Sequence, residues 1–234
     1  MEQGKGIFYT VGVGPGDPEL LTRKAVRILS ECPVIAAPRT RSGGTLALDI
    51  VRQVVPLEGK QLLTLHFSME RNPDQWQEAH RRAADEIQAQ LEAGRSVAMP
   101  NLGDVSLYAT GSYLTDLLRE RGCQTVMVPG VPSFCAVAAC LGDSLTRGDV
   151  PLHVIPAGEA VLEGALDLPG TKVLMKAGSR MDQVFQALER RGLLDRSALV
   201  QDCGLPTQRV FPDLSRPPED TGYFSTIVVK ESVS

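Results

Sequence analysis

The 234-residue sequence predicts an α/β protein of two α/β domains, the first with a mainly parallel sheet and the second with a mixed sheet. In the first half, strand-like and helix-like segments alternate, as they do in doubly wound parallel sheets. Beyond it the strand-like segments continue, but only one clear long helix remains. We therefore expect an N-terminal domain over residues 1–121 and a C-terminal domain over residues 122–234.

The first predicted elements are a strand, a glycine turn and a helix start. Alternating apolar residues predict a strand over 7–13, and the glycines at 12, 14 and 16 permit backbone angles that other residues avoid. Asp17 and Pro18 are expected to cap and open a helix. Its buried stripe, at helical spacing, consists of Leu21, Ala25, Ile28 and Leu29.

The same alternation predicts the remaining elements of both domains. In the first domain, we expect strands at 34–36, 62–65 and 97–99, and helices at 45–54, 75–93 and around 113–118. In the second, we expect strands at 124–128, 171–175, 198–201, 208–210 and 225–229, a small-residue helix at 134–141 and a long helix around 181–188. The proline-rich stretch 212–218 is expected to be a surface loop.

Composition narrows the classes of function. A formal net charge of -4 argues against a nucleic-acid-binding protein that neutralises many phosphates. The chain has no apolar run long enough to cross a bilayer, and residues 1–5 lack the pattern of a signal peptide. We therefore expect a cytoplasmic protein with no membrane and no nucleic-acid partner.

Cysteine and histidine spacing gives little support to a metal site. The five cysteines are scattered and form no C-x-x-C pair, so we expect reduced and mostly buried thiols. The three histidines never recur at i, i+4, so no protein-bound metal is expected. His80, beside two arginines on a helix, is expected to be solvated. His66 follows a strand and either faces a cleft or has a simple structural role.

Two common interpretations of the loop at 12–16 are disfavoured. A P-loop ends in Gly-Lys-Ser/Thr, which is absent here. The dinucleotide fingerprint needs G-x-G-x-x-G, whereas these glycines alternate and Pro15 removes an amide from the turn. The loop therefore suits a ligand without phosphate. The alternative is a turn that merely joins a strand to a helix.

Four loops are expected at the carboxyl ends of predicted strands, at residues 14–16, 102–105, 129–133 and 176–178. Together with the opening G-x-G-P-G-D-P-x-L-L-T from Gly12 to Thr22, they resemble the tetrapyrrole methylase family over nearly the whole chain. This resemblance implies S-adenosylmethionine as cofactor, bound in a cleft between the two domains, and a homodimer.

Some segments resemble the branch that methylates carbon 20 of precorrin-2 or cobalt-factor II in cobalamin biosynthesis. They are Asn101 to Asp104 leading into Leu107 to Thr110, Phe67 to Met69 before the helix that holds Trp76, and Gly222 to Thr226. Two positions depart from the pattern: Val105 replaces a usual proline and Ala109 a usual serine. These departures bear on loop stiffness and leave the inferred cofactor unchanged.

The resemblance also assigns site residues. The family's cofactor contacts correspond to Pro15, Leu102, Gly103, Asp104, Leu107, Pro132, Ser133, Lys176, Gly204 and Thr226. Asp104 is expected to accept hydrogen bonds from the ligand and to favour its positive charge. The alternative role for Asp104 is a helix cap for the segment from Val105 onward.

A reduced tetrapyrrole carries many carboxylates, which call for cations at the rim of the site. The candidates are Arg39, Arg41, Lys176, Arg180 and Arg209, each of which has surface solvation as its alternative role. Tyr108 and His66 are candidates to relay the proton lost from carbon 20. The resemblance implies a methyltransferase with a small-molecule tetrapyrrole substrate. The rivals are methylation at another carbon and a non-catalytic protein that binds a tetrapyrrole or a nucleoside.

Overall fold

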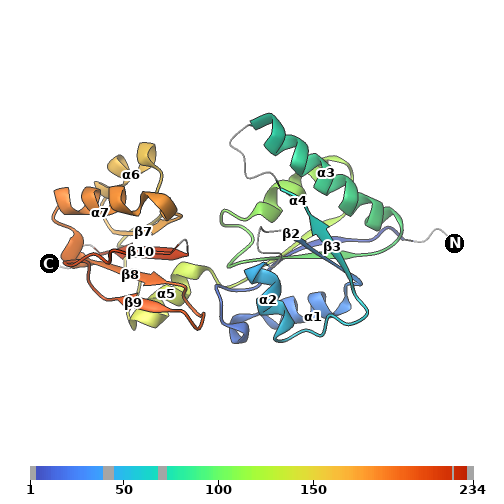
Figure 1. Cartoon of the computed structure of the whole chain (residues 1–234), viewed down its shortest axis with the longest axis horizontal. Coiled ribbons are helices and arrows are strands. Elements are labelled where there is room, and N and C mark those ends of the chain that lie inside the picture. The colour runs from blue at the N-terminus through green and yellow to red at the C-terminus, as the bar shows by residue number, and fades with distance from the viewer. Residues whose placement is uncertain (1–3, 39–44, 68–72, 223, 231–234) are drawn as a thin grey trace. The chain divides into compact units, whose positions relative to one another are not determined.

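The computed structural model describes residues 4–38, 45–67, 73–222 and 224–230. The chain divides into two compact units, Met1–Pro132 and Ser133–Ser234 (Figure 1). The expected boundary after residue 121 lies eleven residues before this division. The reason is that the strand at 125–128 pairs with the first strand of the chain and so belongs to the first sheet.

Unit 1 is built on a five-stranded sheet in the order β3-β2-β4-β1-β5, in which all neighbouring strands are parallel. Its strands are β1 (Phe8–Gly12), β2 (Val34–Pro38), β3 (Gln61–Leu65), β4 (Val97–Asn101) and β5 (Thr125–Val128). Its helices are α1 (Arg23–Glu31), α2 (Leu46–Arg52), α3 (Pro73–Glu92) and α4 (Thr110–Glu120), with a short 3-10 helix at Pro18–Leu20. The predicted parallel sheet is confirmed.

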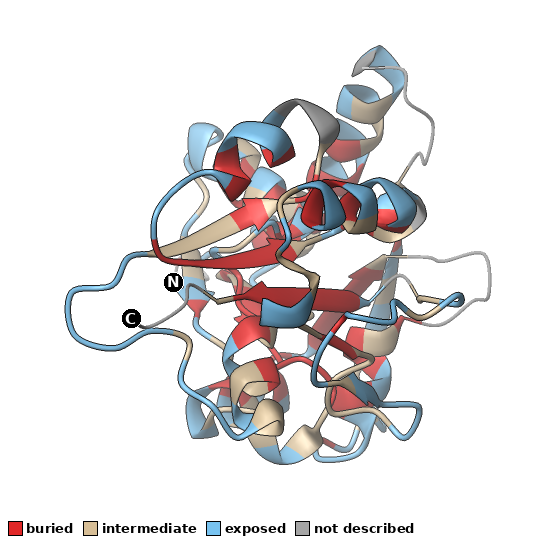
Figure 2. Ribbon diagram, turned by 90° about the vertical axis from the view of Figure 1, so that its left-hand side faces the viewer, coloured by how far each residue is buried: buried red, intermediate tan, exposed pale blue. Residues whose placement is uncertain are grey.

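Helices cover both faces of this sheet because successive residues of each strand point to opposite sides. Ile35 of β2 packs with α1 and α2, whereas its neighbours Val34 and Ala36 pack with α3 and α4. The three inner strands β1, β2 and β4 are therefore largely buried on both faces, whereas the edge strands β3 and β5 are partly exposed (Figure 2).

The start of α1 differs from the prediction. The Asp17 side chain accepts a hydrogen bond from the Glu19 amide at 2.8 Å, but it caps only the 3-10 helix. Thr22 caps α1 itself, since its hydroxyl accepts from the Ala25 amide at 3.1 Å. The expected buried stripe is largely confirmed, with Ala25, Ile28 and Leu29 in the core.

Unit 2 contains a mixed sheet in the order β6-β7-β10-β8-β9, in which only β6 and β7 pair in parallel. Its strands are β6 (Leu152–Pro156), β7 (Thr171–Met175), β8 (Ser197–Gln201), β9 (Arg209–Phe211) and β10 (Ser225–Val229). Its helices are α5 (Ser133–Leu141), α6 (Glu159–Leu166) and α7 (Met181–Arg190), with 3-10 helices at Gly178–Arg180 and Leu194–Arg196. The predicted mixed sheet is confirmed, but β6 and α6 are not among the expected elements.

Two expectations about single residues are wrong. His80 is buried rather than solvated, because Trp76, Phe67 and Tyr113 surround its ring and Nδ1 contacts the Trp76 carbonyl oxygen at 2.8 Å. The five thiols are free, but only Cys32 is buried.

None of the helices in the described ranges combines the length and the hydropathy that crossing a bilayer requires.

Candidate functional site

In unit 1, the loops that follow β1, β4 and β5 meet at one edge of the sheet. Parallel strands end at the same edge, so the expected residues from Pro15, from 102–107 and from Pro132 gather there. Gly14 and Gly103 exchange two backbone hydrogen bonds, at 2.7 and 3.3 Å, which join the loops after β1 and β4. Gly14 has a φ of 75°, an angle that favours glycine.

Two glycines of these loops are required by contacts between backbones. A Cβ added to Gly12 would lie 2.5 Å from the Gly130 nitrogen. A Cβ added to Gly130 would lie 2.2 Å from the Gly103 carbonyl oxygen. Both distances are far below van der Waals contact, and backbone atoms cannot move aside as a flexible side chain can. The close packing of the three loops therefore accounts for glycine at both positions.

Asp104 is buried and bonded within the protein. One carboxylate oxygen accepts from the Ser106 amide at 2.8 Å and from the Ser106 hydroxyl at 2.5 Å. The other oxygen accepts from the Gly130 amide at 2.8 Å. Asp104 does not cap α4, because that helix begins at Thr110, after the flanking Ala109. The helix-cap alternative is therefore wrong.

Tyr108 and His66 lie at the same edge of unit 1. Tyr108 follows β4, is 42% exposed and has a φ of 54°, an uncommon angle for a bulky residue. His66 follows β3 and is exposed. Leu107, which directly precedes Tyr108, is half-buried. Arg39 and Arg41 lie outside the described residues.

In unit 2, the expected residues also share one edge of the sheet. Since β10 runs antiparallel to β7 and β8, the start of β10 lies beside the carboxyl ends of those two strands. This places Thr226 of β10 at the same edge as Lys176, which follows β7, and Gly204, which follows β8. Ser133 is the half-buried first residue of α5.

Backbone conformation at this edge of unit 2 is unusual. Lys176 and Asp202, directly after β7 and β8, have φ angles of 59° and 51°. Such angles in residues other than glycine cluster at functional sites. The Gly204 amide donates to Gln208 Oε1 at 2.8 Å, and Gln208 Nε2 donates to Cys140 Sγ at 3.3 Å, so the loop after β8 is tied to α5.

The candidate cations of unit 2 differ in their surroundings. Burial lowers the pKa of the Lys176 ammonium below its usual range. Arg209 donates to the Asp220 carbonyl oxygen at 3.1 Å, and its guanidinium lies 5.0 Å from the centre of the Phe211 ring. Arg180 is exposed at the end of the 3-10 helix that follows β7.

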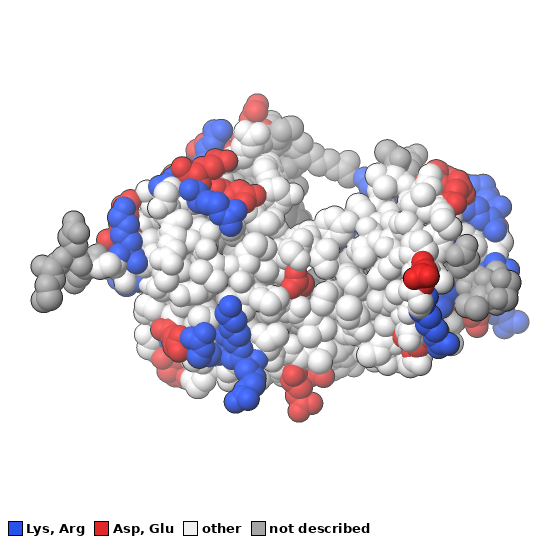
Figure 3. Space-filling view, turned by 180° about the vertical axis from the view of Figure 1, so that it is seen from behind, with Lys and Arg blue, Asp and Glu red and all other residues white. Residues whose placement is uncertain are grey.

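The three loops of unit 1 contain no lysine or arginine at residues 13–17, 102–109 and 129–132. Their charged residues are Asp17 and Asp104, and the others are apolar residues, glycines, prolines, one serine and one tyrosine. These loops therefore fit a ligand that is cationic or neutral and carries no phosphate. On the face drawn in Figure 3, basic side chains lie beside acidic ones in small groups and form no single basic patch.

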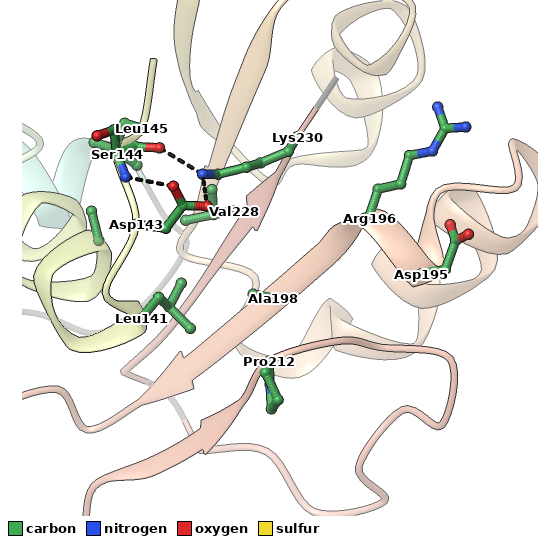
Figure 4. A pocket seen from close by; sticks show the side chains of 11 residues that line it. Leu141, Asp143, Ser144, Leu145, Asp195, Arg196, Ala198, Pro212, Val228 and Lys230 are labelled. Atoms are coloured by element: carbon green, nitrogen blue, oxygen red, sulfur yellow. Dashed lines mark hydrogen bonds and ion pairs between the residues drawn. The ribbon is translucent and has the colours of Figure 1, made fainter. Parts of the chain in front are cut away.

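A pocket of about 430 Å³ lies elsewhere in unit 2 (Figure 4). Leu141, Ala198 and Val228 give it apolar lining, and Lys230, which also lines it, contacts Asp143 and donates to the Ser144 carbonyl oxygen. None of the expected site residues lines it. The hydrogen bond from Lys230 is the largest cause of the lowered pKa of Asp143.

Sequence patterns missed two side chains that organise the edge of unit 1. Asn101 is buried and accepts from the Gly111 amide at 3.1 Å while donating to the Met99 carbonyl oxygen at 2.8 Å. It thereby fixes the first turn of α4 against the end of β4. Ser106 is the partner of Asp104 described above. The nearest signal in the sequence is the short spacing of Ser106 from Asp104, which suits a local turn.

Comparisons with known proteins agree with this architecture. The sequence profile of the Tetrapyrrole (Corrin/Porphyrin) Methylases matches residues 8–216. The chain is 34% identical over 233 residues to the cobalt-precorrin-2 C(20)-methyltransferase of Salmonella typhimurium, with 97% of each chain covered. It is 30% identical over 237 residues to the precorrin-2 C(20)-methyltransferase of a Sinorhizobium species, with 97% of this chain and 96% of the relative covered.

A solved structure has the same fold. The uroporphyrin-III C-methyltransferase of Thermus thermophilus, complexed with S-adenosylhomocysteine, superposes with a TM-score of 0.70. That likeness covers 97% of this chain and 98% of the other, at 24% sequence identity.

Proposed function

The chain belongs to the tetrapyrrole (corrin/porphyrin) methylase family, and on that premise we propose that it methylates carbon 20 of precorrin-2 or of its cobalt-containing counterpart in cobalamin biosynthesis. The observation that carries the proposal is the 34% identity, across 97% of both chains, to a relative named for methylation at carbon 20. The branch-like segments, such as Asn101 to Asp104, support the same assignment.

S-adenosylmethionine is the methyl donor of this family, and it supplies an electrophilic methyl group. We propose that its contacts in unit 1 come from Pro15, Leu102, Gly103, Asp104, Leu107 and Pro132, and in unit 2 from Ser133, Lys176, Gly204 and Thr226. The composition of the unit 1 loops supports this, because the donor carries a positive charge and no phosphate. The closely packed glycine backbones at this edge of the sheet support such contacts.

The protein's part in the reaction is positioning and the exclusion of water. A correctly oriented methyl group and carbon gain about 7 to 11 kcal/mol from proximity in favourable cases, without a strong base. Arg180, Arg209 and Lys176 are proposed to bind substrate carboxylates, together with Arg39 and Arg41. Tyr108 and His66, both exposed, are the proposed groups for moving the proton lost from carbon 20.

Two other functions remain as rivals. A methylase of the same family would act at a different carbon of the macrocycle, and a non-catalytic protein would only hold a tetrapyrrole or nucleoside. Incubation with S-adenosylmethionine labelled in its methyl group, with metal-free or cobalt-loaded precorrin-2 as acceptor, separates them. We expect label at carbon 20 of the macrocycle, and label at a different carbon would favour the other methylase. Tight cofactor binding without transfer would leave only the binding protein, and the faster of the two acceptors identifies the natural substrate.

We further propose that the enzyme works in the cytoplasm as a homodimer. The free thiols support a reducing compartment, since disulfides are rare there. Multi-angle light scattering on the purified chain tests the dimer. A mass of twice 25.2 kDa is expected, and a single-chain mass at micromolar concentration would contradict it.

A further inference from the structure

Both oxygens of the Asp104 carboxylate accept hydrogen bonds from the protein. The carboxylate accepts from the Ser106 amide, the Ser106 hydroxyl and the Gly130 amide. An ionised carboxylate offers about four lone-pair positions. Three donors from the protein therefore occupy most of these positions, and both carboxylate oxygens are bonded to the protein's own loops.

These bonds connect loops that are distant in sequence. Ser106 belongs to the loop after β4, whereas Gly130 follows β5, 26 residues after Asp104. Gly130 also packs against the backbone of Gly12, the last residue of β1, and against the backbone of Gly103 in the loop that follows β4. The Asp104 carboxylate thus fixes Gly130 at the point where all three loops of the candidate site meet.

Burial makes these bonds strong. Asp104 is 9% exposed. Burial by itself raises its pKa, but hydrogen bonds, chiefly those from Ser106 and Gly130, outweigh that effect and leave the pKa below its ordinary value. The group is therefore charged at neutral pH, and hydrogen bonds to a charged acceptor are roughly twice as strong as neutral ones.

We propose that Asp104 and Ser106 are positioning residues, whose side chains clamp the loops after β1, β4 and β5 in the arrangement that receives the cofactor and do not bond the cofactor themselves. The inference rests on the proposed function and changes one part of it. The expected bond from the Asp104 side chain to the ligand is replaced by contacts from the backbone that the clamp holds. Preorganised loops lower the cost of ordering on binding, so a looser clamp weakens affinity without removing a ligand contact.

The experiment compares four variants with the wild type. Asp104→Asn places an NH₂ group opposite a donor and so breaks part of the clamp. Ser106→Ala removes the hydroxyl that donates to Asp104. The clamp needs this hydroxyl, whereas a direct bond from Asp104 to the ligand does not. Ser106→Thr restores the hydroxyl at a position exposed enough to take an extra methyl group. Ser112→Ala is the matched control, since it deletes a serine hydroxyl bonded to the Ala109 carbonyl oxygen outside the clamp.

Three measurements are made on each protein. Calorimetry with S-adenosylhomocysteine gives the Kd, and thermal melting reports the fold. Hydrogen exchange on the ligand-free protein reports the amides of the non-proline residues within 12–16 and 129–132. We expect the Kd to rise about tenfold for Asp104→Asn and about threefold to fivefold for Ser106→Ala. Exchange should accelerate in both loop segments. Ser106→Thr and Ser112→Ala should match the wild type in Kd.

Two results would overturn the proposal. If Ser106→Ala left both Kd and exchange unchanged while Asp104→Asn weakened binding, Asp104 would be a direct ligand. If melting temperatures fell in the clamp variants with no change in Kd, the clamp would stabilise the fold only. Failure of the wild type to bind S-adenosylhomocysteine would instead contradict the proposed function, and exchange in the ligand-free protein would still test the clamp.

Discussion

Gly130 shows how a single residue can be fixed by the backbone of another loop. Replacing it with alanine would place a Cβ 2.2 Å from the Gly103 carbonyl oxygen, so the loops must separate. We expect Gly130→Ala to lower the free energy of unfolding by about 1 to 3 kcal/mol and to weaken cofactor binding. Urea unfolding and calorimetry measure the two effects. Unchanged values for both would show that the loops do not pack this closely.

Gly164 provides the matched control. It lies within α6, has no positive φ, and an added Cβ would meet nothing within 4 Å. Gly164→Ala should raise the free energy of unfolding by about 0.5 to 1 kcal/mol, because alanine suits a helix interior better than glycine. Urea unfolding checks the sign, and a destabilised Gly164→Ala variant would contradict the assignment of α6.

The lowered pKa of Asp104 makes its contribution to the free energy of unfolding depend on pH. Its pKa is lower in the folded protein than in the unfolded chain, so its contribution to stability is fully present above the unfolded value of about 3.9. The contribution disappears as the pH falls through the lowered folded value. The difference in unfolding free energy between the wild type and Asp104→Ala should therefore be constant near neutral pH and shrink in acid. Urea unfolding from pH 7 to pH 3 tests this, and a constant difference throughout would contradict it.

The structure explains why some residues of the site were predictable and others were not. The glycines of the first loop are visible in the sequence, but their cause is not, because Gly12 and Gly130 meet only after β1 and β5 have paired. The sequence predicts a ligand contact for the Asp104 carboxylate, but it does not reveal the hydrogen bonds of that carboxylate to Ser106 and Gly130. Such contacts depend on the register of a sheet, which no local pattern specifies.

Among the secondary-structure elements, the capping of α1 tests the corrected helix start. Thr22→Ala should cost about 1 kcal/mol, because it removes the acceptor of the Ala25 amide at the start of a nine-residue helix. Asp17→Ala should cost less, since that exposed bond supports a single 3-10 turn. Urea unfolding of the two variants decides the matter, and a larger loss for Asp17→Ala would place the functional cap where the sequence first suggested it.

Strands and helices with a clear hydrophobic pattern were predicted correctly, and those without one were not. Strands β7 and β10 occur at the predicted bounds, since both are apolar runs flanked by turn residues. The helix α6 was missed because it spans only Glu159–Leu166 and contains Gly164, which weakens any helical pattern. The strand β6 carries His153 and ends in a proline, so neither alternation nor a long apolar run marks it.

For the whole molecule, the order of the strands determined what could be predicted. The alternation of strands and helices predicts a parallel first sheet, and this is confirmed. The strand at 125–128 precedes the helix at 133–141, and composition alone cannot tell which sheet it joins. Its pairing with β1 places the division between the units at Pro132 and Ser133. The proposed function depends on the family to which the chain belongs. In the sequence, the loops at the ends of the strands already indicate this family.

The position of the transferred methyl group tests the central claim most directly. Precorrin-2 is incubated with S-adenosylmethionine whose methyl group is enriched in carbon-13, and the product is examined by NMR spectroscopy. A single enriched methyl signal coupled to carbon 20 is predicted. Enrichment at any other carbon would contradict the account, and so would binding of both molecules with no enriched product.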